Sequence, residues 1–421
     1  MSLLEKASMI HNTLKKLKKS IRFGSGNRID IFIIIGLFII VITPIIIHLS
    51  FRIEAAAKQV NLYLSAQMEE LFGKKKIDSL LREFEERNPG IKIRFGSGEA
   101  DILFFDDGEF NALIDTNSLL ELNSYTNYDS GGRQMAIPLV SFMDMLFYNI
   151  DILAAAGFGS PPKTRDEFLN YARTVSRGEF NAFGTALSLS FQDKHALSRD
   201  IFSWIWAGGG SLFTADGNRP SLNTRAIIND ITFIGTLYRD EIIAPGIFDT
   251  TGVQRIDQFA QGNVALMIAS ARAIPYLRQR MGDSAFGIST VPDLGGGARS
   301  SVNLSALYVG INTKTSYPDE AWRFLEFLAE KSSFLCEELN AIPGVVSDII
   351  PGDYVRDDPF YSKAWDIFES VLIAESFCGR PNAIQYESIF LEELKIFFET
   401  GRTAQDTVNA VQRRWDAIES P

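Results

Sequence analysis

The stretch AIPLVSFMDMLFYNIDILAAAGFGSPPKT, residues 136–164, decides how the fold of this chain is interpreted. It ends with Pro161 and Pro162 in a rigid loop, because each proline ring restricts its own backbone. Thr164 and Glu167 then stand in the pattern of a capping box, in which each side chain satisfies a free amide at a helix start. The helix is predicted to continue through apolar residues at helical spacing: Phe168, Tyr171, Ala172 and Val175.

Strand-like and helix-like segments alternate before this stretch. Residues 59–64 alternate polar and apolar side chains, as a strand with one buried face does. An amphipathic helix follows, with its apolar stripe formed by Ile77, Leu80, Leu81 and Phe84. Asn88–Pro89–Gly90 ends that helix, residues 91–95 alternate again, and residues 100–105 form the short apolar run of a buried strand. This β-α-β-β order predicts an α/β domain.

Another strand–helix unit is predicted further along the chain. Residues 307–311 form its strand, and a helix begins near Asp319. The apolar face of this helix is formed by Ala321, Phe324, Leu325 and Leu328. A chain of 421 residues is too large for one small domain and suits two lobes.

Charge divides the chain into unequal parts. Residues 1–28 carry seven basic residues and one acid, a net charge of +6, whereas the remaining residues carry 34 basic and 51 acidic side chains, a net charge of −17. An acidic body lacks the clustered Lys and Arg that neutralise phosphates, so no nucleic-acid partner is expected. Residues 31–49 contain no charge and, at 1.5 Å per residue, would span roughly 28 Å as a helix, close to the thickness of a bilayer core.

We therefore expect a basic cytoplasmic leader, residues 1–28, followed by a membrane anchor, residues 29–50, that contacts the lipid bilayer through residues 31–49. The positive-inside bias places the leader in the cytoplasm and the body on the extracytoplasmic side, in the periplasm or outside the cell, as a single-pass membrane protein. The alternative is a signal peptide that is removed, for which Ala55–Ala56–Ala57 could serve as the cleavage site.

Cysteine and histidine are scarce, and this excludes several kinds of site. Cys336 and Cys378 are the two cysteines, so a four-cysteine zinc site is excluded, and the two either pair as an exported disulfide or remain separate thiols. His195 is the one histidine beyond residues 31–49, which removes the zinc-protease motif. No phosphate-binding loop is present either, and we expect no metal and no cofactor.

An acidic cluster follows the strand predicted at residues 100–105. Asp106, Asp107 and Glu109 stand together at the strand end. They could hold a ligand hydroxyl or amine, take part in glycoside hydrolysis, or be solvated. Hydrolysis needs a second carboxylate from elsewhere, and the sequence nominates none, so no catalytic residue is expected and a glycoside-active enzyme is a distant alternative.

Short motifs follow one another along the chain: Ile137–Pro138, Tyr148–Asn149, Ala156–Gly157, PPKT at 161–164 with Glu167, FAQGNVALM at 259–267, AWRFLEFL at 321–328, IPGVV at 342–346 and Arg380–Pro381. With its motifs in this order, the chain resembles extracellular solute-binding proteins of the maltose-binding type. The resemblance implies a periplasmic-binding-protein fold, with two α/β lobes, a hinge and a cleft between the lobes that holds the ligand. Lobe I is expected at residues 58–140 plus 306–342, and lobe II at residues 145–300 plus 345–421.

The resemblance also implies binding positions. They are Phe105, Asp106, Asp107 and Glu109 at the strand end, Phe142 in the crossover, Trp204 and Trp206 before a glycine turn, Arg272, and Tyr386 after Arg380–Pro381. Arg272 is a departure, because sugar binders of the family commonly carry tryptophan there; its guanidinium group suits carboxylate or phosphate and also binds sugar hydroxyls.

Each of these positions has a structural alternative. Phe105 and Phe142 could be core residues, and Trp204 and Trp206 stand two residues apart, so on a helix they cannot share a face and one of them is expected in the core. Arg272 could pair with a surface acid.

Together with the membrane anchor expected at residues 29–50, the resemblance implies a tethered substrate-binding protein that delivers a small solute, a carbohydrate or polyol, to the permease subunits of an ABC importer. The alternative is a module of the same kind that senses a solute for a signalling partner.

Overall fold

A computed structural model describes residues 59–96, 99–125, 133–193, 197–217, 219–295, 300–339, 341–343, 353–374 and 377–419. The basic leader, the expected membrane anchor, Ala55–Ala57 and His195 lie outside these residues. Within the described ranges no helix has both the length and the apolar character needed to cross a bilayer.

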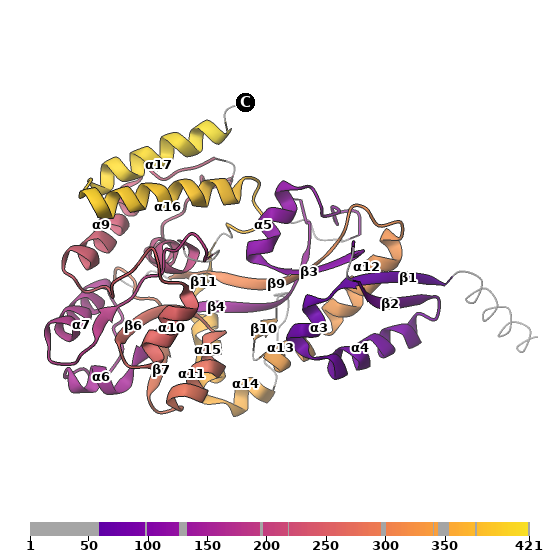
Figure 1. The fold of residues 1–421 in the computed structure, drawn as a ribbon, viewed down its shortest axis with the longest axis horizontal. Helices are drawn as coiled ribbons and strands as arrows, with labels where there is room; N and C mark the ends of the chain where they lie inside the picture. Colours follow the sequence, from indigo (N-terminus) through magenta and orange to yellow (C-terminus); the bar gives the residue numbers. More distant parts are fainter. Residues whose placement is uncertain are drawn as a thin grey trace, which may run out of the picture. The chain divides into compact units, whose positions relative to one another are not determined.

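One mixed sheet runs through the described chain (Figure 1). Its order is β2 (Ile91–Gly96), β1 (Val60–Ser65), β3 (Ile102–Asp106), β9 (Leu304–Ile311), β4 (Ile137–Asn149), β6 (Val264–Ser270) and β5 (Phe183–Thr185). β1 is parallel to β2 and β3, whereas β9 is antiparallel to both β3 and β4. β7 (Phe286–Ser289) and β10 (Ile342–Pro343) also pair with β4, and β8 (Ser301–Val302) pairs with β11 (Leu372–Ile373).

Strand β4, the centre of the opening stretch, joins the two parts of this sheet. Its residues up to Met143 pair with β9, and its residues from Asp144 onward pair with β6 and β7. Most of its side chains are buried, because elements cover both of its faces. We name the elements around β1–β3 and β9 the first lobe, and those around β5–β7 the second lobe.

Helices α3 (Gln67–Phe72), α4 (Lys74–Arg87), α5 (Asp107–Asp115), α12 (Pro318–Glu330) and α13 (Ser332–Leu339) belong to the first lobe. The Phe84 ring of α4 packs against Phe324 and Phe327 of α12, at centroid distances of 4.9 and 5.4 Å.

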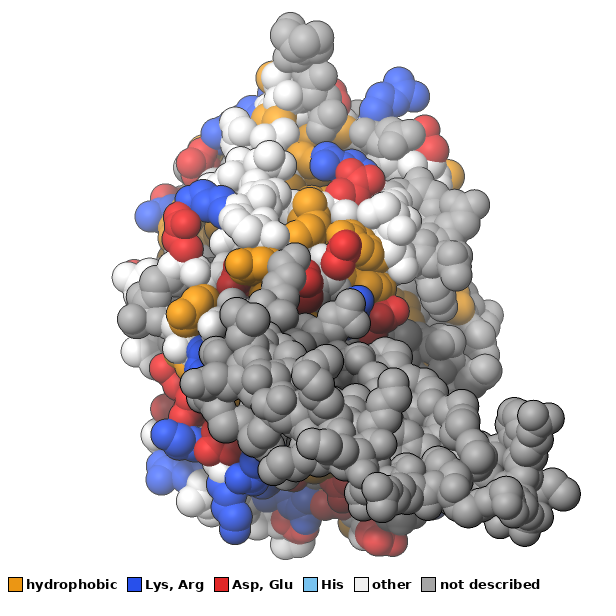
Figure 2. Space-filling view, turned by 90° about the vertical axis from the view of Figure 1, so that its right-hand side faces the viewer, with side chains coloured by type: hydrophobic (Ala, Val, Ile, Leu, Met, Phe, Trp, Pro, Cys, Tyr) orange, Lys and Arg blue, Asp and Glu red, His pale blue; other side chains and the backbone are white. Residues whose placement is uncertain are grey.

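On the face shown in Figure 2, acidic and basic side chains are interspersed where they are drawn in colour. This mixture is typical of a solvated surface.

The second lobe contains the larger set of helices. They are α6 (Ile150–Ala155), α7 (Arg165–Arg177), the π-helical turn η1 (Ser198–Phe202), α8 (Ser203–Ala207), α9 (Arg225–Arg239), α10 (Gly252–Ala260), α11 (Ala273–Met281), α14 (Asp353–Asp357), α15 (Pro359–Ser370), α16 (Ala383–Thr400) and α17 (Ala404–Glu419). Helices α9, α16 and α17 lie side by side in Figure 1, and α17 contacts both of the others.

Most predicted local elements are confirmed. The strand expected at residues 59–64 is β1, the stripe around Phe84 is the buried face of α4, and α7 begins with the capping box of Thr164 and Glu167. The disulfide alternative is wrong. Cys336 is buried on α13 and Cys378 donates a hydrogen bond to the carbonyl oxygen of Asp107, so both remain thiols.

Candidate functional site

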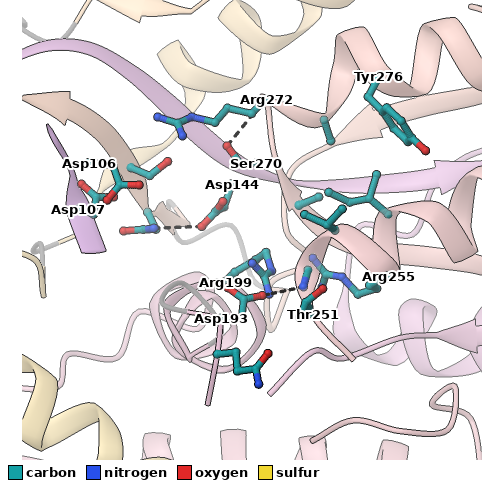
Figure 3. Close-up of a pocket in the computed structure, with 18 of the residues that line it drawn as sticks. Asp106, Asp107, Asp144, Asp193, Arg199, Thr251, Arg255, Ser270, Arg272 and Tyr276 are labelled. Carbon is teal, nitrogen blue, oxygen red and sulfur yellow. Dashed lines mark hydrogen bonds and ion pairs between the residues drawn. The ribbon is translucent and has the colours of Figure 1, made fainter. Parts of the chain in front are cut away.

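A cavity of about 720 Å³ lies between elements of the two lobes (Figure 3). The first lobe contributes Asp106 and Asp107 from the end of β3 and the start of α5, together with residues 305–306 of β9. The second lobe contributes residues 251–253 and 255–256 at the start of α10, residues 269–270 of β6, and Arg272, Ala273 and Tyr276 at the start of α11. This volume is within the usual range for small-molecule sites.

Asp106 and Asp107 hold the acidic side of the cavity. Asp106 is the N-cap of α5: its carboxylate accepts a hydrogen bond from the Glu109 amide at 3.1 Å, and the Glu109 carboxylate accepts one from the Asp106 amide at 3.4 Å. Glu109 therefore completes the helix cap and is not among the cavity-lining residues. Asp107 is buried and accepts a hydrogen bond from the Ala306 amide at 3.1 Å. Burial raises the pKa of Asp107 to about 7.

Asp144 forms part of the cavity wall at the point where β4 passes from one lobe to the other. Its carboxylate is buried and accepts a hydrogen bond from the Asn303 side-chain amide at 3.0 Å. Burial raises the pKa of Asp144 to about 6. Asp144 is the one charged residue within the apolar β4 strand, and this was the signal by which the sequence could have nominated it.

Arg272 follows β6, and its guanidinium carbon lies 4.2 Å from the centroid of the Phe142 ring. Phe142 is buried and does not itself line the cavity. Its ring supports the Arg272 side chain that does. The alternative that Arg272 pairs with a surface acid is not realised, because no ion pair of its side chain is found within the described ranges. Burial lowers the pKa of Arg272, while the charges of Asp106 and two further aspartates oppose this shift.

A buried ionic cluster forms another part of the cavity wall. Arg199 pairs with Asp193 at 2.8 Å and with Asp200 at 3.1 Å, and Arg255 pairs with Asp200. Asp193 also accepts a hydrogen bond from the amide of Gly252 at 2.7 Å, which ties the cluster to the start of α10. The negative charges of Asp200 and Asp193 raise the pKa of Arg199 although burial opposes them, whereas burial lowers the pKa of Arg255 to about 10.

Sequence reasoning missed this cluster, although α10 carried a signal for it. Gly252, Arg255 and Phe259 form the buried face of α10 at helical spacing. A charged side chain within the buried stripe of an amphipathic helix needs a buried partner, because an isolated charge is costly to desolvate.

The remaining predicted residues lie in the hydrophobic core and do not line the cavity. Trp204 and Trp206 are both buried, and their rings lie 4.9 Å from Phe168 and 5.7 Å from Phe202, respectively. The sequence had placed only one of the two tryptophans in the core; both are there because every residue from Arg199 to Ala207 is buried.

Tyr386 and Phe105 are also core residues. The buried Tyr386 ring on α16 packs against Trp415 of α17, with the ring centroids 4.8 Å apart. Phe105, on β3, contacts Phe110 and Tyr308 at centroid distances of 5.4 and 5.9 Å, so its ring lies away from the cavity.

Two α/β lobes joined by a shared strand, with a charged cavity between them, define a binding protein of the two-lobed class. A model of the bacterial extracellular solute-binding protein family matches residues 64–333, and the chain belongs to this family. Because it is a family of solute-binding proteins, the chain is a binding protein and not an enzyme.

Individual proteins show the same likeness. A relative from Deinococcus radiodurans, named as an ABC transporter-binding protein, is 26% identical over 261 residues, which cover 58% of this chain and 60% of the relative. The cyclic alpha-maltosyl-1,6-maltose binding protein of Arthrobacter globiformis is 16% identical with a TM-score of 0.69, and the alignment covers 86% of this chain and 99% of that one.

A solute-binding protein of an ABC transporter from Agrobacterium radiobacter K84, in complex with ribitol, is 18% identical with a TM-score of 0.62, and covers 86% of this chain and 99% of its own. At these identities the two structures establish the two-lobed fold. The chain spans less than two thirds of the length of the Deinococcus relative.

Proposed function

We propose that this chain is the substrate-binding component of an ABC importer and holds a small polyhydroxylated solute in the cavity between its lobes. The observation that carries the proposal is the composition of the cavity wall. Asp106 and Asp107 of the first lobe can accept hydrogen bonds from hydroxyl groups, and Arg272 of the second lobe can donate them. A sugar or polyol offers both donors and acceptors and satisfies the two sides together.

A ligand of this kind also explains how binding could be signalled. A solute that contacts both lobes favours the closed arrangement only by the contacts it gains there, and the permease can distinguish this arrangement from the open one. Three of the similar proteins support the same role: an ABC transporter-binding protein, a cyclic alpha-maltosyl-1,6-maltose binding protein and a solute-binding protein in complex with ribitol.

The proposal includes a membrane tether formed by residues 29–50, with the leader in the cytoplasm and residues 58–421 on the other side. It also includes the lobe bounds expected from the sequence, 58–140 plus 306–342 and 145–300 plus 345–421. Support for the tether comes from the uncharged run at residues 31–49 and the basic residues before it.

A thermal-shift screen of the full chain tests the binding role, in a detergent without a sugar headgroup. A sugar or polyol present at 100 times its dissociation constant should stabilise the folded protein by about 2.7 kcal/mol. If no sugar or polyol shifts the melting temperature while amino acids or phosphates do, the proposed solute class is wrong. Loss of solute uptake on deletion separates import from the alternative of sensing, in which uptake would persist.

A further inference from the structure

The carboxylates that surround the cavity outnumber the guanidinium groups that could balance them. Within the buried ionic cluster, Arg199 and Arg255 balance Asp193 and Asp200. The rest of the charged wall consists of Asp106, Asp107 and Asp144 against Arg272, a formal charge of −2 (Figure 3).

No cation of the described chain pairs with the two buried members of this group. The hydrogen-bond donors to Asp107 are neutral, namely the Ala306 amide and the side chains of Tyr308 and Cys378, and the donor to Asp144 is the Asn303 amide. Burial raises the pKa of both aspartates, and the charges of Arg272 on Asp107 and of Arg199 and Arg255 on Asp144 oppose this rise without cancelling it.

Other groups around Asp107 form no ion pair with it, although the charge of Arg272 favours its ionised form. Glu387 of α16 faces it as a further acid, and burial, followed by the charge of Asp107, raises the pKa of Glu387 to about 8. Arg272 stacks on Phe142 and has no ion pair among the described residues. A cationic group on the ligand would therefore be attracted by the net negative charge of this part of the cavity wall.

A second and independent observation concerns hydrogen-bond donors. The side chain of Arg272 lines the cavity, and within the described residues its guanidinium group has no ion pair and no hydrogen-bond acceptor. Its N–H groups can therefore donate to a ligand, so a ligand that enters this cavity is expected to bring acceptor oxygens. Nε and Nη2 of Arg255 and Nε of Arg199 also lack acceptors among the described residues, but these atoms are buried behind the cavity wall, out of reach of a ligand.

These two observations narrow the ligand class. A carboxylate ligand would pair with Arg272 but add to the negative charge, and a polyamine would balance the charge but bring no acceptor oxygens. We infer that the ligand carries a protonated amine together with hydroxyl groups, as an amino sugar or amino polyol does. The amine would lie among Asp106, Asp107 and Asp144, and hydroxyl oxygens would accept hydrogen bonds from Arg272. The inference rests on the proposed function and names its solute class.

Calorimetric titration of the full chain with matched pairs tests this inference. Glucosamine is compared with glucose, and glucamine with sorbitol, at about pH 7 and low salt; gluconate and spermidine are the anionic and polyamine probes. We expect the amine to bind about tenfold more tightly than its neutral partner in at least one pair, because a charge-assisted hydrogen bond is about twice as strong as a neutral one. The preference should shrink at pH 5, where the two buried aspartates are protonated, and at high salt.

Substitutions test whether the preference for the amine depends on the charges of the cavity wall. Asp106→Asn keeps an N-cap residue on α5 but removes one charge, so it should lower the amine preference about fivefold. Arg272→Gln removes the neighbouring positive charge and should raise the preference. Asp366→Asn, exposed on α15, has the same chemistry away from the cavity and should leave it unchanged.

Each remaining outcome is decisive. Equal binding of glucose or sorbitol and the matched amine overturns the inference and leaves the proposed function standing. Tightest binding of gluconate or of spermidine overturns it in the same way. If neither pair binds at all, the inference and the proposed sugar or polyol class fail together.

Discussion

Asp107 makes the stability of this protein depend on pH in a direction opposite to that of an ordinary salt-bridged aspartate. In the folded protein its carboxyl group keeps a proton up to about pH 7, whereas in the unfolded chain it releases the proton near the usual value of 3.8. Between these two values the folded state binds more protons than the unfolded state. The free energy of unfolding therefore falls as the pH rises through this window and is level above about pH 7.

The structure sets the size of the effect. A shift of one pKa unit corresponds to about 1.4 kcal/mol, so the shift of Asp107 from 3.8 to about 7 corresponds to about 4 kcal/mol. Asp107→Asn cannot ionise and can still accept the Ala306 amide hydrogen bond. Relative to the wild-type protein, this variant should gain about 4 kcal/mol of unfolding free energy between pH 4 and pH 8.

Urea unfolding followed by circular dichroism at a series of pH values measures this difference. Asp144 and Glu387 titrate in both proteins, so subtracting the two curves isolates Asp107, apart from a small fall in the pKa of Glu387 once its neighbouring charge is gone. Asp366→Asn is the control, because its exposed carboxyl should produce a flat difference. A difference curve for Asp107→Asn that is also flat from pH 4 to pH 8 would refute the reasoning.

Three further predictions concern the core, the buried ion pair and the tether. Arg255→Met leaves Asp200 with one arginine in a buried site and should cost about 3–5 kcal/mol of unfolding free energy; a loss below about 1 kcal/mol in urea unfolding would contradict the ionic cluster. Trp204→Ala should cost about 3–5 kcal/mol by removing a core ring, while calorimetry of the folded variant should show unchanged ligand affinity, since Trp204 does not line the cavity. The chain should stay with the membrane pellet after an alkaline carbonate wash and have the mass of the uncleaved sequence; cleavage after residues 55–57 would show a signal peptide instead.

Local patterns carried most of the predicted fold. The stripe that ends at Phe84 is enough to predict α4, and the hydroxyl and carboxylate of the α7 capping box act within one turn of the same helix. Such features depend on residues close in sequence, so they can be recognised before any tertiary contact is known. The family motifs extended this knowledge to the two-lobed fold, which the family match confirms.

The site was predicted less completely. Asp106, Asp107 and Arg272 do line the cavity, but the aromatic candidates Trp204 and Tyr386 are core residues. A buried aromatic ring and a ligand-stacking ring have the same local sequence signature, because both are large apolar side chains beside turns. Only their surroundings distinguish them, and these surroundings come from distant helices such as α9 and α17.

The class of this protein can be recognised from its sequence alone, because the body alternates strands and helices and carries the motifs of solute-binding proteins in order. Which charges share the cavity depends instead on the tertiary structure. Asp107 and Ala306 stand 199 residues apart, and Arg255 meets Asp200 across 55 residues. The burial of Asp107 and Asp144 arises from such long-range contacts, and it raises the pKa of both carboxyl groups.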